Sequence, residues 1–528
     1  MLPTKLKIIA LRSKAIDIPT VLFLLGALGF LYCFLFIPPF LPVDGNGAGD
    51  TFINLAPGQR MFQGDMIYRD VFEFLPPGTA LVNFFMFKLF GLRLWIPDLL
   101  AVLLGSALAW LGVVVSRKLM RPGVALLPSA IFLVSAHTSL CDPTHHWYSL
   151  LATVAAIAAL IESRTPTRIA AAGFFSGLSL CFTQTVGLAA VAGFALFLLW
   201  ESRQRQEGWR RLLRKEAWLA VSFFTTFLAI NTYFIWKAGP ARFFWCTVVF
   251  VLKYYPKQAD LNSFNALKIF FPAFVSLRTF LHPFAEWLLL LAVIPLTFII
   301  FFIRYWRESR KKPLEYWERP MMVAIVGFFL FLSSAPAPSV ARMAAISLPA
   351  FILLGWWLDS PRKLARIFVV VLTVGTPLEA VHLVARGRPT AVGILETPQG
   401  KLASVDRDRF NELTWIQQHT QPLDYLYAPT DRSLYFYLNL RNPTPQSIIS
   451  NTGYTTPQQV AEAIRGLEQH QARYILWSSG DMDLLPAWEN PSDGHLGPLR
   501  NYLHSNYKLV KTFPNDFEIW EKQAEQVR

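Results

Sequence analysis

The stretch DGNGAGDTFINLAPGQRMFQGDMIYRDVFEFLPPGTA, from Asp44 to Ala80, follows the first long apolar run of the chain. It carries five acids, two arginines, several glycines and the pair Pro76-Pro77. The apolar run before it is long enough to cross the hydrocarbon core of a bilayer, which takes about 20 helical residues. Acids gathered directly beside a membrane segment make this stretch the first candidate for a functional site.

The rest of the chain repeats this alternation of apolar runs and short polar loops. Of the 528 residues, 53% are hydrophobic and only 16% are charged, whereas a soluble domain carries about 25% charged residues. The net charge is +14, but the basic residues cluster in short loops between apolar segments, which is a topology signal rather than a binding face. The sequence therefore predicts a polytopic α-helical membrane protein without a nucleic-acid partner.

Eleven membrane-spanning helices are predicted, because apolar runs of about 18–23 residues recur along the chain. One boundary is weak, since only Thr183 and Gln184 interrupt the apolar run that contains the fifth and sixth spans. The predicted spans are centred near Leu28, Leu104, Ile131, Val154, Phe174, Ala192, Phe227, Val293, Phe328, Leu353 and Val370.

The basic residues predict the orientation of these spans. The N-terminus and every second loop after it are rich in Lys and Arg, so this side is predicted to be cytoplasmic. An odd number of spans then places the C-terminal region outside the cytoplasmic membrane, together with the stretch from Asp44 to Ala80. A cleaved signal peptide is disfavoured, because the first apolar run ends in Pro-Pro rather than in a small-residue cleavage site. The N-terminal basic residues are Lys5, Lys7, Arg12 and Lys14.

The polar region 386–528 differs in character from the transmembrane region 1–385, and the two are predicted to be separate domains. DYLYAPT, SLYFYLN and ARYILWSS have the pattern of short strands. TPQQVAEAIRGLEQHQ has the pattern of a helix with Thr456 as N-cap and Pro457 in the first turn. These elements predict a small extracytosolic α/β domain. It contains no nucleotide-binding glycine motif.

The four cysteines do not predict a disulfide framework or a metal site. All of them lie in or beside apolar segments, and no pair has metal-ligand spacing. They are Cys33, Cys141, Cys181 and Cys246.

Three acids of the first outer loop are candidate catalytic residues. Asp50 lies in a Gly-rich segment, and a carboxylate at a membrane surface serves as a general base or a metal ligand. Asp70 and Glu73 are three residues apart, so they would share a face on a helical turn. The alternative for Asp50 is a solvated loop acid. The alternative for Asp70 and Glu73 is a short amphipathic surface segment with a turn, and their spacing alone does not decide between the two interpretations.

Candidate binding residues lie in other outer segments. His145 and His146 could contact a phosphate or an acceptor; the alternative is an interfacial belt with Trp147, and their spacing does not predict a helical two-histidine metal site. Arg342 opens a span and suits bidentate phosphate contact; the alternative is snorkelling to the interface. The segment RFFWCTVVFVLKYYPKQADLNSF could lie on the membrane and hold an anionic lipid, or it is an ordinary interfacial segment.

The order of motifs in the first outer loop resembles the GT-C superfamily of integral-membrane glycosyltransferases. It is most similar to the bacterial branch related to protein O-mannosyltransferases and lipid A aminoarabinose transferases. The resemblance covers most of the chain, since it includes the many-span architecture and the extracytosolic tail. The motifs that carry it are Asp50, Gly64, Tyr68-Arg69-Asp70, Glu73, Pro76-Pro77-Gly78 and the sequence FKLFG.

The resemblance implies a transmembrane catalytic domain that transfers a hexosyl or pentosyl group from a polyprenyl-phosphate donor. The acceptor would be a glycan, lipid or protein at the outer face. Asp50 would act as general base or position the acceptor, with Asp70 or Glu73 as second acid. No cofactor is expected for this branch, although oligosaccharyltransferases of the superfamily use a metal, so a divalent metal stays open. The implied substrate-binding residues are Tyr68, Arg69, His145, His146 and Arg342, of which Arg342 would meet the lipid phosphate.

Two features depart from the family pattern. Relatives often have a basic residue or His directly before the Pro-Pro pair, where this chain has Leu75. Many also carry an Asp and a His near the tenth span, where this chain reads ARMAAISLP. Both departures weaken the assignment of the phosphate site and leave the donor open.

Two other functions compete with the transferase. A transporter or flippase for a lipid-linked sugar would need ionisable groups deep inside several spans, and Glu379 and His382 are the nearest examples in this chain. A non-catalytic cell-envelope scaffold would bind a partner through its outer domain. It would tolerate changes at Asp50 and Glu73.

Overall fold

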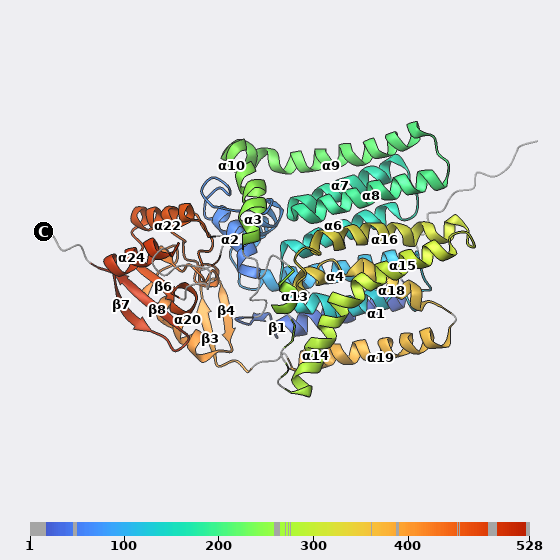
Figure 1. The fold of residues 1–528 in the computed structure, drawn as a ribbon. Helices are drawn as coiled ribbons and strands as arrows, with labels where there is room; N and C mark the ends of the chain where they lie inside the picture. Colours follow the sequence, from blue (N-terminus) through green and yellow to red (C-terminus); the bar gives the residue numbers. More distant parts are fainter. Residues whose placement is uncertain are drawn as a thin grey trace, which may run out of the picture.

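The structure is a computed structural model of the chain. It describes residues 17–45, 50–257, 264–269, 271–272, 274, 276–360, 362–386, 390–450, 452, 455–483 and 494–523. The N-terminal basic residues (5–14) lie outside the described residues. Long helices run side by side in a bundle, and a domain that contains most of the strands lies at one end of it (Figure 1).

Among the described residues, seven helices are long and apolar enough to cross a membrane. One of these spans, Pro283–Glu308, comprises the end of α14 (Leu277–Leu288), the π-helix η5 (Leu289–Val293) and α15 (Ile294–Glu308). The others are α1 (Ile18–Leu35), α4 (Ile96–Ser116), α8 (Gln184–Gln204), α9 (Trp209–Ala238), α16 (Leu314–Ser334) and α19 (Lys363–Arg386).

The remaining four predicted spans are shorter helices. Each of the eleven predicted centres lies in a helix, so the prediction of a polytopic helical membrane protein is confirmed. The expected length of about 18–23 residues is exceeded by Trp209–Ala238 and Pro283–Glu308, which have 30 and 26 residues, and four spans are shorter than expected. These are α5 (Leu127–Ile131) with η1 (Phe132–His137) and η2 (Thr138–Leu140), α6 (His145–Leu160), α7 (Pro166–Phe182) and α18 (Leu348–Leu358).

Glycines let the helices of the bundle approach closely. A Cβ added at Gly173 would lie 2.3 Å from the Leu219 carbonyl oxygen of α9, and one at Gly177 would lie 2.6 Å from that of Phe223. Small residues serve membrane helix packing in this way, because no hydrophobic effect drives helices together in lipid. Thr183 has an extended backbone and separates α7 from α8, which explains why the weak boundary in the sequence is a real one.

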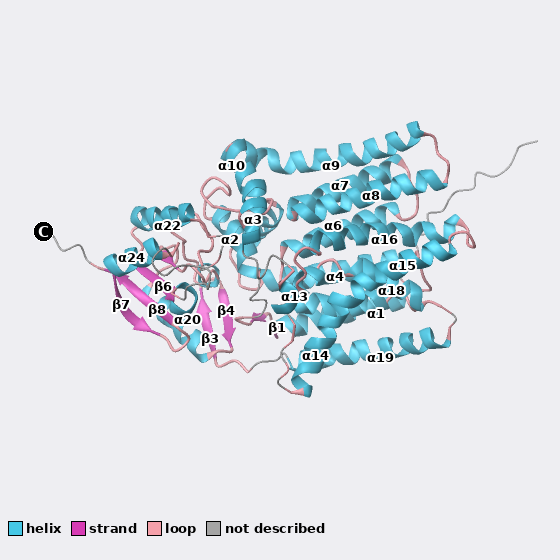
Figure 2. Ribbon diagram, in the orientation of Figure 1, coloured by secondary structure: helices cyan, strands magenta, loops and turns pink. Residues whose placement is uncertain are grey.

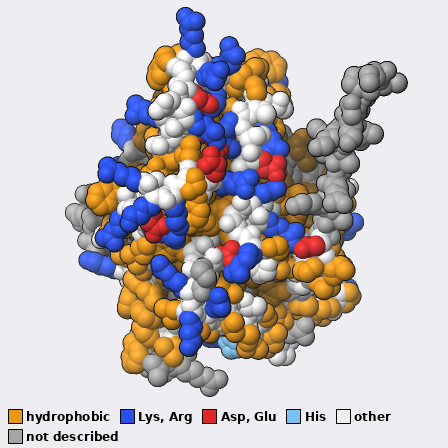
Figure 3. All heavy atoms as spheres, turned by 90° about the vertical axis from the view of Figure 1, so that its right-hand side faces the viewer, with side chains coloured by type: hydrophobic (Ala, Val, Ile, Leu, Met, Phe, Trp, Pro, Cys, Tyr) orange, Lys and Arg blue, Asp and Glu red, His pale blue; other side chains and the backbone are white. Residues whose placement is uncertain are grey.

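The end of the bundle that lies away from the C-terminal domain is strongly basic (Figure 3). Several of its cations pair with acids from neighbouring helices: Arg117 with Asp17, and Arg164 with both Glu201 and Glu318. This arrangement has the charge distribution expected of a cytoplasmic surface. The side of the membrane on which this end lies stays a prediction.

Short elements connect the long helices at the opposite end of the bundle. The strands β1 (Phe36–Ile37) and β2 (Leu41–Pro42) form a small hairpin directly after α1. The helical elements are α2 (Thr51–Phe62), α3 (Gly78–Phe90), α10 (Pro240–Phe244), η3 (Trp245–Val249), α11 (Phe250–Lys253), η4 (Tyr255–Lys257), α13 (Ala266–Ile269) and α17 (Val340–Ala344).

The C-terminal domain is α/β, as predicted (Figure 2). It starts with the hairpin β3 (Gly393–Thr397) and β4 (Gly400–Ser404). A four-stranded sheet follows in the order β5-β6-β8-β7, in which only β5 and β6 are parallel. The remaining elements are α20 (Arg407–His419), β5 (Leu426–Tyr427), α21 (Ser433–Tyr437), α22 (Pro457–His470), β6 (Tyr474–Ser478), α23 (Ser479–Met482), α24 (Gly497–Asn506), β7 (Tyr507–Thr512) and β8 (Phe517–Lys522).

The local predictions for this domain are partly confirmed. The helix α22 has Thr456 as N-cap in a full capping box with Gln459, and ARYILWSS contains β6. The strand prediction for SLYFYLN is wrong, because this segment forms the helix α21. All five residues of α21 are buried. An element buried on every side shows no alternation of polar and apolar residues, so its sequence does not distinguish a helix from a strand.

Candidate active site

Three side chains from distant parts of the chain meet at the end of the bundle that faces the C-terminal domain. Asp50 is the N-cap residue of α2, and His145 and His146 open α6. The potential ligand atoms of these three residues all lie within 4.8 Å of one another. Each side chain is half-buried, so the cluster is accessible but partly shielded from solvent.

Hydrogen bonds fix this cluster from both sides. The Asp50 carbonyl accepts from the backbone N–H and the Nδ2 of Asn54, at 3.0 and 2.7 Å. Asn54 also joins the two halves of the site, because its Oδ1 accepts from the N–H of His145 at 3.4 Å. The Nδ1 atom of His145 lies 2.9 Å from Oγ1 of Thr183, and the two imidazole rings are 3.9 Å apart.

Asp142 is a second acid at this cluster, and it was not among the candidate site residues predicted from the sequence. It is 1% exposed, and its Oδ2 accepts from the Thr51 hydroxyl at 3.4 Å. Its Oδ1 has no hydrogen-bond partner within the described part of the chain. Burial, and then the nearby charge of Asp50, raise the pKa of Asp142 well above its usual value. The sequence signal was an acid shortly before the histidine pair in the same outer segment.

Arg342 completes the polar cluster. Its backbone N–H donates to the Ser339 hydroxyl, which caps α17. Its guanidinium donates to the Ala337 carbonyl and to the Tyr255 hydroxyl, each at 3.0 Å. The charge of Arg342 acts on both histidines. The structure thus brings Arg342, Asp50, His145 and His146 together.

Glu73 occupies a buried turn beside this cluster. It is 7% exposed, and its Oε1 accepts from the N–H groups of Phe74 and Leu75 at 2.8 and 2.9 Å. Burial outweighs these two hydrogen bonds and raises the pKa of Glu73 to about 7. The neighbouring Phe74 ring lies 5.4 Å from the ring of Tyr255, the partner of Arg342. The turn that holds Glu73 is therefore linked to Arg342 through Phe74 and Tyr255, and the Glu73 carboxyl is protonated up to near-neutral pH.

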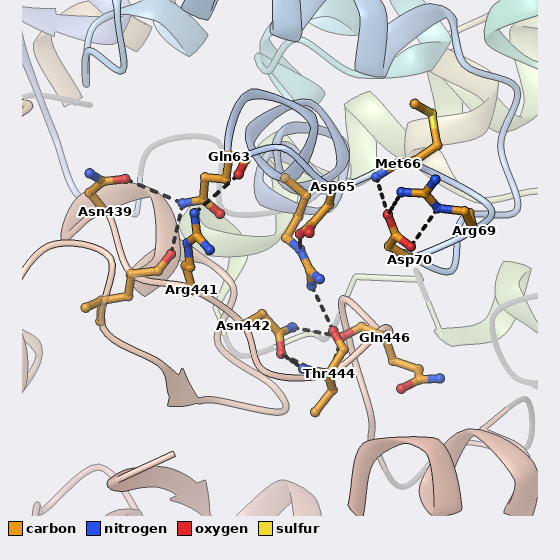
Figure 4. A network of polar contacts seen from close by, with 12 residues as sticks. Gln63, Asp65, Met66, Arg69, Asp70, Asn439, Arg441, Asn442, Thr444 and Gln446 are labelled. Atoms are coloured by element: carbon orange, nitrogen blue, oxygen red, sulfur yellow. Dashed lines mark hydrogen bonds and ion pairs between the residues drawn. The ribbon is translucent and has the colours of Figure 1, made fainter. Parts of the chain in front are cut away.

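Asp70 is in a different environment from Glu73. Figure 4 shows its carboxylate between the Arg69 guanidinium and the N–H of Met66, at 2.7 and 2.9 Å. Arg69 holds the pKa of this carboxyl below its usual range. The expected helical turn is absent here, since Tyr68 has a φ of 68° and the segment turns back on itself. Asp70 and Glu73 therefore do not share a face.

Tyr68 has a structural role in this turn. Its ring is fully buried, and its hydroxyl donates to the Leu75 carbonyl at 2.6 Å. The ring also packs edge-on against Phe243 at 5.0 Å. Tyr68 thus supports the Glu73 turn from below, whereas the predicted substrate-binding partner Arg69 lies on the exposed surface.

Gly78 explains the Pro-Pro-Gly motif and provides a stability prediction. It opens α3, and a Cβ there would lie 2.6 Å from the Cys181 carbonyl oxygen and 2.7 Å from the Phe182 ring. We expect Gly78→Ala to lower the free energy of unfolding by about 1–3 kcal/mol, because the backbone of α7 has to move. Thermal unfolding in detergent measures this change. Gly26→Ala is the control, since nothing lies within 4 Å of its added Cβ; equal melting of both variants would contradict the prediction.

Comparison with known proteins gives a result only at the level of structure. No family model and no curated protein sequence matches the chain. The fold is similar to that of ArnT from Cupriavidus metallidurans bound to undecaprenyl phosphate, with a TM-score of 0.57 and 15% identity over 96% of this chain and 98% of ArnT. The same ArnT in the apo state gives a TM-score of 0.55 and 16% identity over 95% and 97% of the two chains. The chain has the GT-C fold.

A second GT-C structure is more distant. It is the archaeal oligosaccharyltransferase AglB from Archaeoglobus fulgidus, in complex with an inhibitory peptide and a dolichol-phosphate. Its TM-score is 0.52 and its identity 10%, over 96% of this chain and 74% of AglB. The resemblance to the GT-C superfamily in the first outer loop is thereby confirmed as a shared fold. At these identities the likeness defines the architecture, and the chemistry has to be argued from the residues of this chain.

Proposed function

We propose that the protein is a membrane glycosyltransferase that moves a sugar from a polyprenyl-phosphate donor to an acceptor. The observation that carries this proposal is the convergence of Asp50, His145, His146 and Arg342 beside the buried Glu73. Such a site combines a base, imidazoles and a phosphate-binding cation, which are the groups this reaction needs. The GT-C fold, shared with structures that hold undecaprenyl phosphate and dolichol-phosphate, supports it.

In the proposed reaction an acceptor hydroxyl or amine attacks the anomeric carbon of the sugar. Asp50 takes the proton from the acceptor as the new bond forms. The bond between the anomeric carbon and the phosphate oxygen breaks, and polyprenyl phosphate leaves with the electron pair. Arg342, oriented by Tyr255, stabilises the charge on this phosphate. Glu73 rather than Asp70 is the second acid, because the charge of Asp70 is already neutralised by Arg69.

The proposed arrangement in the cell follows from the charge distribution. The basic end of the bundle faces the cytoplasm, so the site opens at the outer face of the cytoplasmic membrane. Residues 1–385 form the catalytic domain, and 386–528 form an extracytosolic domain over the site. Transfer of a hexosyl or pentosyl group to a glycan, lipid or protein acceptor fits this geometry, and membrane lipids surround the bundle.

We also propose a second role for this cluster, an alternative to that of Asp50 as base, in which Asp50, His145 and His146 hold a divalent cation. One carboxylate and two imidazoles are a donor set that suits transition metals such as Mn²⁺ or Zn²⁺, and the Oδ1 of buried Asp142, which has no hydrogen-bond partner among the described residues, lies nearby. The sequence predicted no metal site from the spacing of the two histidines on one helix. The site proposed here differs from that type, because its third ligand, Asp50, comes from the start of α2. A bound cation would supply positive charge for the donor phosphate.

Binding of Mn²⁺ to the purified protein tests this cation site. We expect His146→Gln to weaken Mn²⁺ binding by at least about tenfold, since changes around metal sites cost about 10–100-fold in affinity. Titration followed by electron paramagnetic resonance measures free Mn²⁺ directly. His419→Gln in the C-terminal domain is the control, because this exposed ring stacks on Trp415 away from the cluster. Equal affinity in both variants would refute the site.

The transferase proposal is tested with purified protein in lipid and a panel of radiolabelled polyprenyl-phosphate sugars. Loss of label from the carrier, dependent on the protein and on a mixture of envelope acceptors, is the expected result. Label that crosses the bilayer while staying on its carrier would instead identify a flippase. Neither consumption nor transport with any donor of the panel would favour the scaffold interpretation.

A further inference from the structure

The C-terminal domain is firmly attached to the segment that carries Asp50. Backbone hydrogen bonds join the two, from the N–H of Asp44 to the Ala403 carbonyl at 2.7 Å and from the N–H of Phe72 to the Pro445 carbonyl at 2.9 Å. Side chains of α2 reach the same domain, as when Gln59 donates to the Tyr435 carbonyl at 2.6 Å. Figure 4 shows further contacts of this kind at Gln63, which lies against Asn439 and Arg441 and donates to the Leu440 carbonyl.

Arg409 lies at the centre of one part of this interface. Its guanidinium pairs with Asp431 at 2.5 Å, with Asp44 at 3.5 Å and with Glu412. It also donates to the Ser433 hydroxyl at 2.5 Å. The four charged groups are almost completely shielded from solvent, with side-chain exposures between 0 and 16%. The Arg409 guanidinium therefore connects the first outer segment, α20 and the start of α21.

The helix α21 carries this connection to the active site. Arg409 and Asp431 hold its first residue, Ser433. At its other end, the Tyr437 hydroxyl lies near the Asp44 carboxylate and affects its pKa, and the Tyr437 ring packs edge-on against Phe52 at 5.1 Å. Phe52 lies in the first turn of α2, two positions after Asp50. Leu55 of α2 and Leu434 of α21 belong to the same hydrophobic core.

We propose that Arg409 is a positioning residue: through Asp44 and α21 it holds the start of α2, and with it Asp50, against the C-terminal domain. This inference rests on the proposed function only in the role given to Asp50. The C-terminal domain is then a fixed part of the active site. It does not act as a mobile module that brings the acceptor.

The charges around Arg409 make the attachment of Asp44 to the C-terminal domain depend on pH. The groups facing Glu412 are Arg409 on its own helix, Asp431 before α21, Asp44 of the first segment and Asn515, which donates to it at 3.1 Å. Burial raises the pKa of Glu412 to about 7. Below that pH it is neutral and Arg409 faces two carboxylates. Above that pH the ionised Glu412 adds a third negative charge, which competes for the Arg409 guanidinium and repels Asp44. The attachment of Asp44 to the C-terminal domain therefore weakens as pH rises.

Hydrogen–deuterium exchange on the full-length protein in lipid tests the proposal without any donor. We expect Arg409→Gln to speed exchange at Asp44 and in the first turn of α2 by at least about tenfold, because carboxylates are left buried without their partner. Arg473→Gln is the matched control in the same domain, since its pair with Glu521 is exposed. Exchange in these segments that is equal in Arg409→Gln and Arg473→Gln overturns the proposal.

A second variant covers the case in which Arg409→Gln does not fold. Glu412→Gln keeps the shape of the side chain and removes its charge. After correction for intrinsic exchange, the wild type should exchange faster at Asp44 at pH 8 than at pH 6, and Glu412→Gln should show no such difference. The same pH response in both proteins overturns the proposal. If these results hold while the wild type consumes no donor, the positioning role of Arg409 is supported and the proposed function fails.

Discussion

Asp50→Asn is expected to reduce sugar transfer by about 10²–10⁴-fold, the range by which acid–base catalysts contribute to rate. The amide has nearly the shape of the carboxylate, but it does not accept the proton of the acceptor. The fold should be unaffected, because Asp50 contacts α2 through its backbone carbonyl and the side chain does not cap the helix. The measurement is the rate of label loss from the carrier at saturating donor.

Asp65→Asn is the matched control for this experiment. It makes the same chemical change in the same segment, but Asp65 pairs with Arg60 away from the cluster. It should keep most of the transfer activity. Equal rates for the wild type and Asp50→Asn would show that the base lies elsewhere, and equal losses in both variants would point to a general disturbance of the loop.

Glu73→Gln is expected to change both stability and activity as a function of pH. In the unfolded chain this carboxyl has a pKa of 4.5, and in the folded protein it is about 7. The raised pKa stabilises the folded state below about pH 4.5, and this contribution of about 3 kcal/mol is lost as pH rises through 7. Glutamine stays neutral and still accepts both backbone N–H groups, so the variant should be more stable than the wild type at pH 8 and similar to it near pH 4.

The second acid is proposed to act in its protonated form, so transfer by the wild type should fall above about pH 7, where Glu73 loses its proton. Glu73→Gln should have a low rate without this alkaline decline. Thermal unfolding at pH 4.5 and pH 8, with a pH–rate profile, measures both effects. Asp70→Asn is the comparison, since its carboxyl is ionised and paired with Arg69 throughout this range. If Asp70→Asn flattens the profile and Glu73→Gln does not, the two acids have been assigned in the wrong order.

The transmembrane part of the fold could be predicted because lipid imposes one rule on every segment. A backbone in hydrocarbon has to satisfy its own hydrogen bonds, so an apolar run such as Ile96–Ser116 has to be helical. No equivalent rule applies to α21, where SLYFYLN is buried in the C-terminal domain by contacts that local sequence does not encode. The helical turn predicted between Asp70 and Glu73 was wrong for the same reason, because contacts with distant residues decide the path of this segment.

The site could be predicted one residue at a time but not as a cluster. Asp50 and the pair His145-His146 were visible as unusual residues, yet about 95 positions separate them. Their meeting depends on how α2 packs beside α6. Asp142 was missed because an acid in a turn is usually solvated, and only the structure shows it buried under Asp50. The link from Arg409 to Asp50 spans most of the chain and leaves no local pattern.

The attachment of the first outer segment to the C-terminal domain also sets the order in which the protein matures. Asp50 leaves the ribosome about 400 residues before Tyr437, which corresponds to roughly 20–80 s of synthesis at about 5–20 residues per second. During that interval the first segment lacks the strands and the arginine that hold it. An inserted chain that stops before Arg409 would therefore carry every residue of the polar cluster and still have no assembled site. Translation of the last domain therefore completes the proposed site.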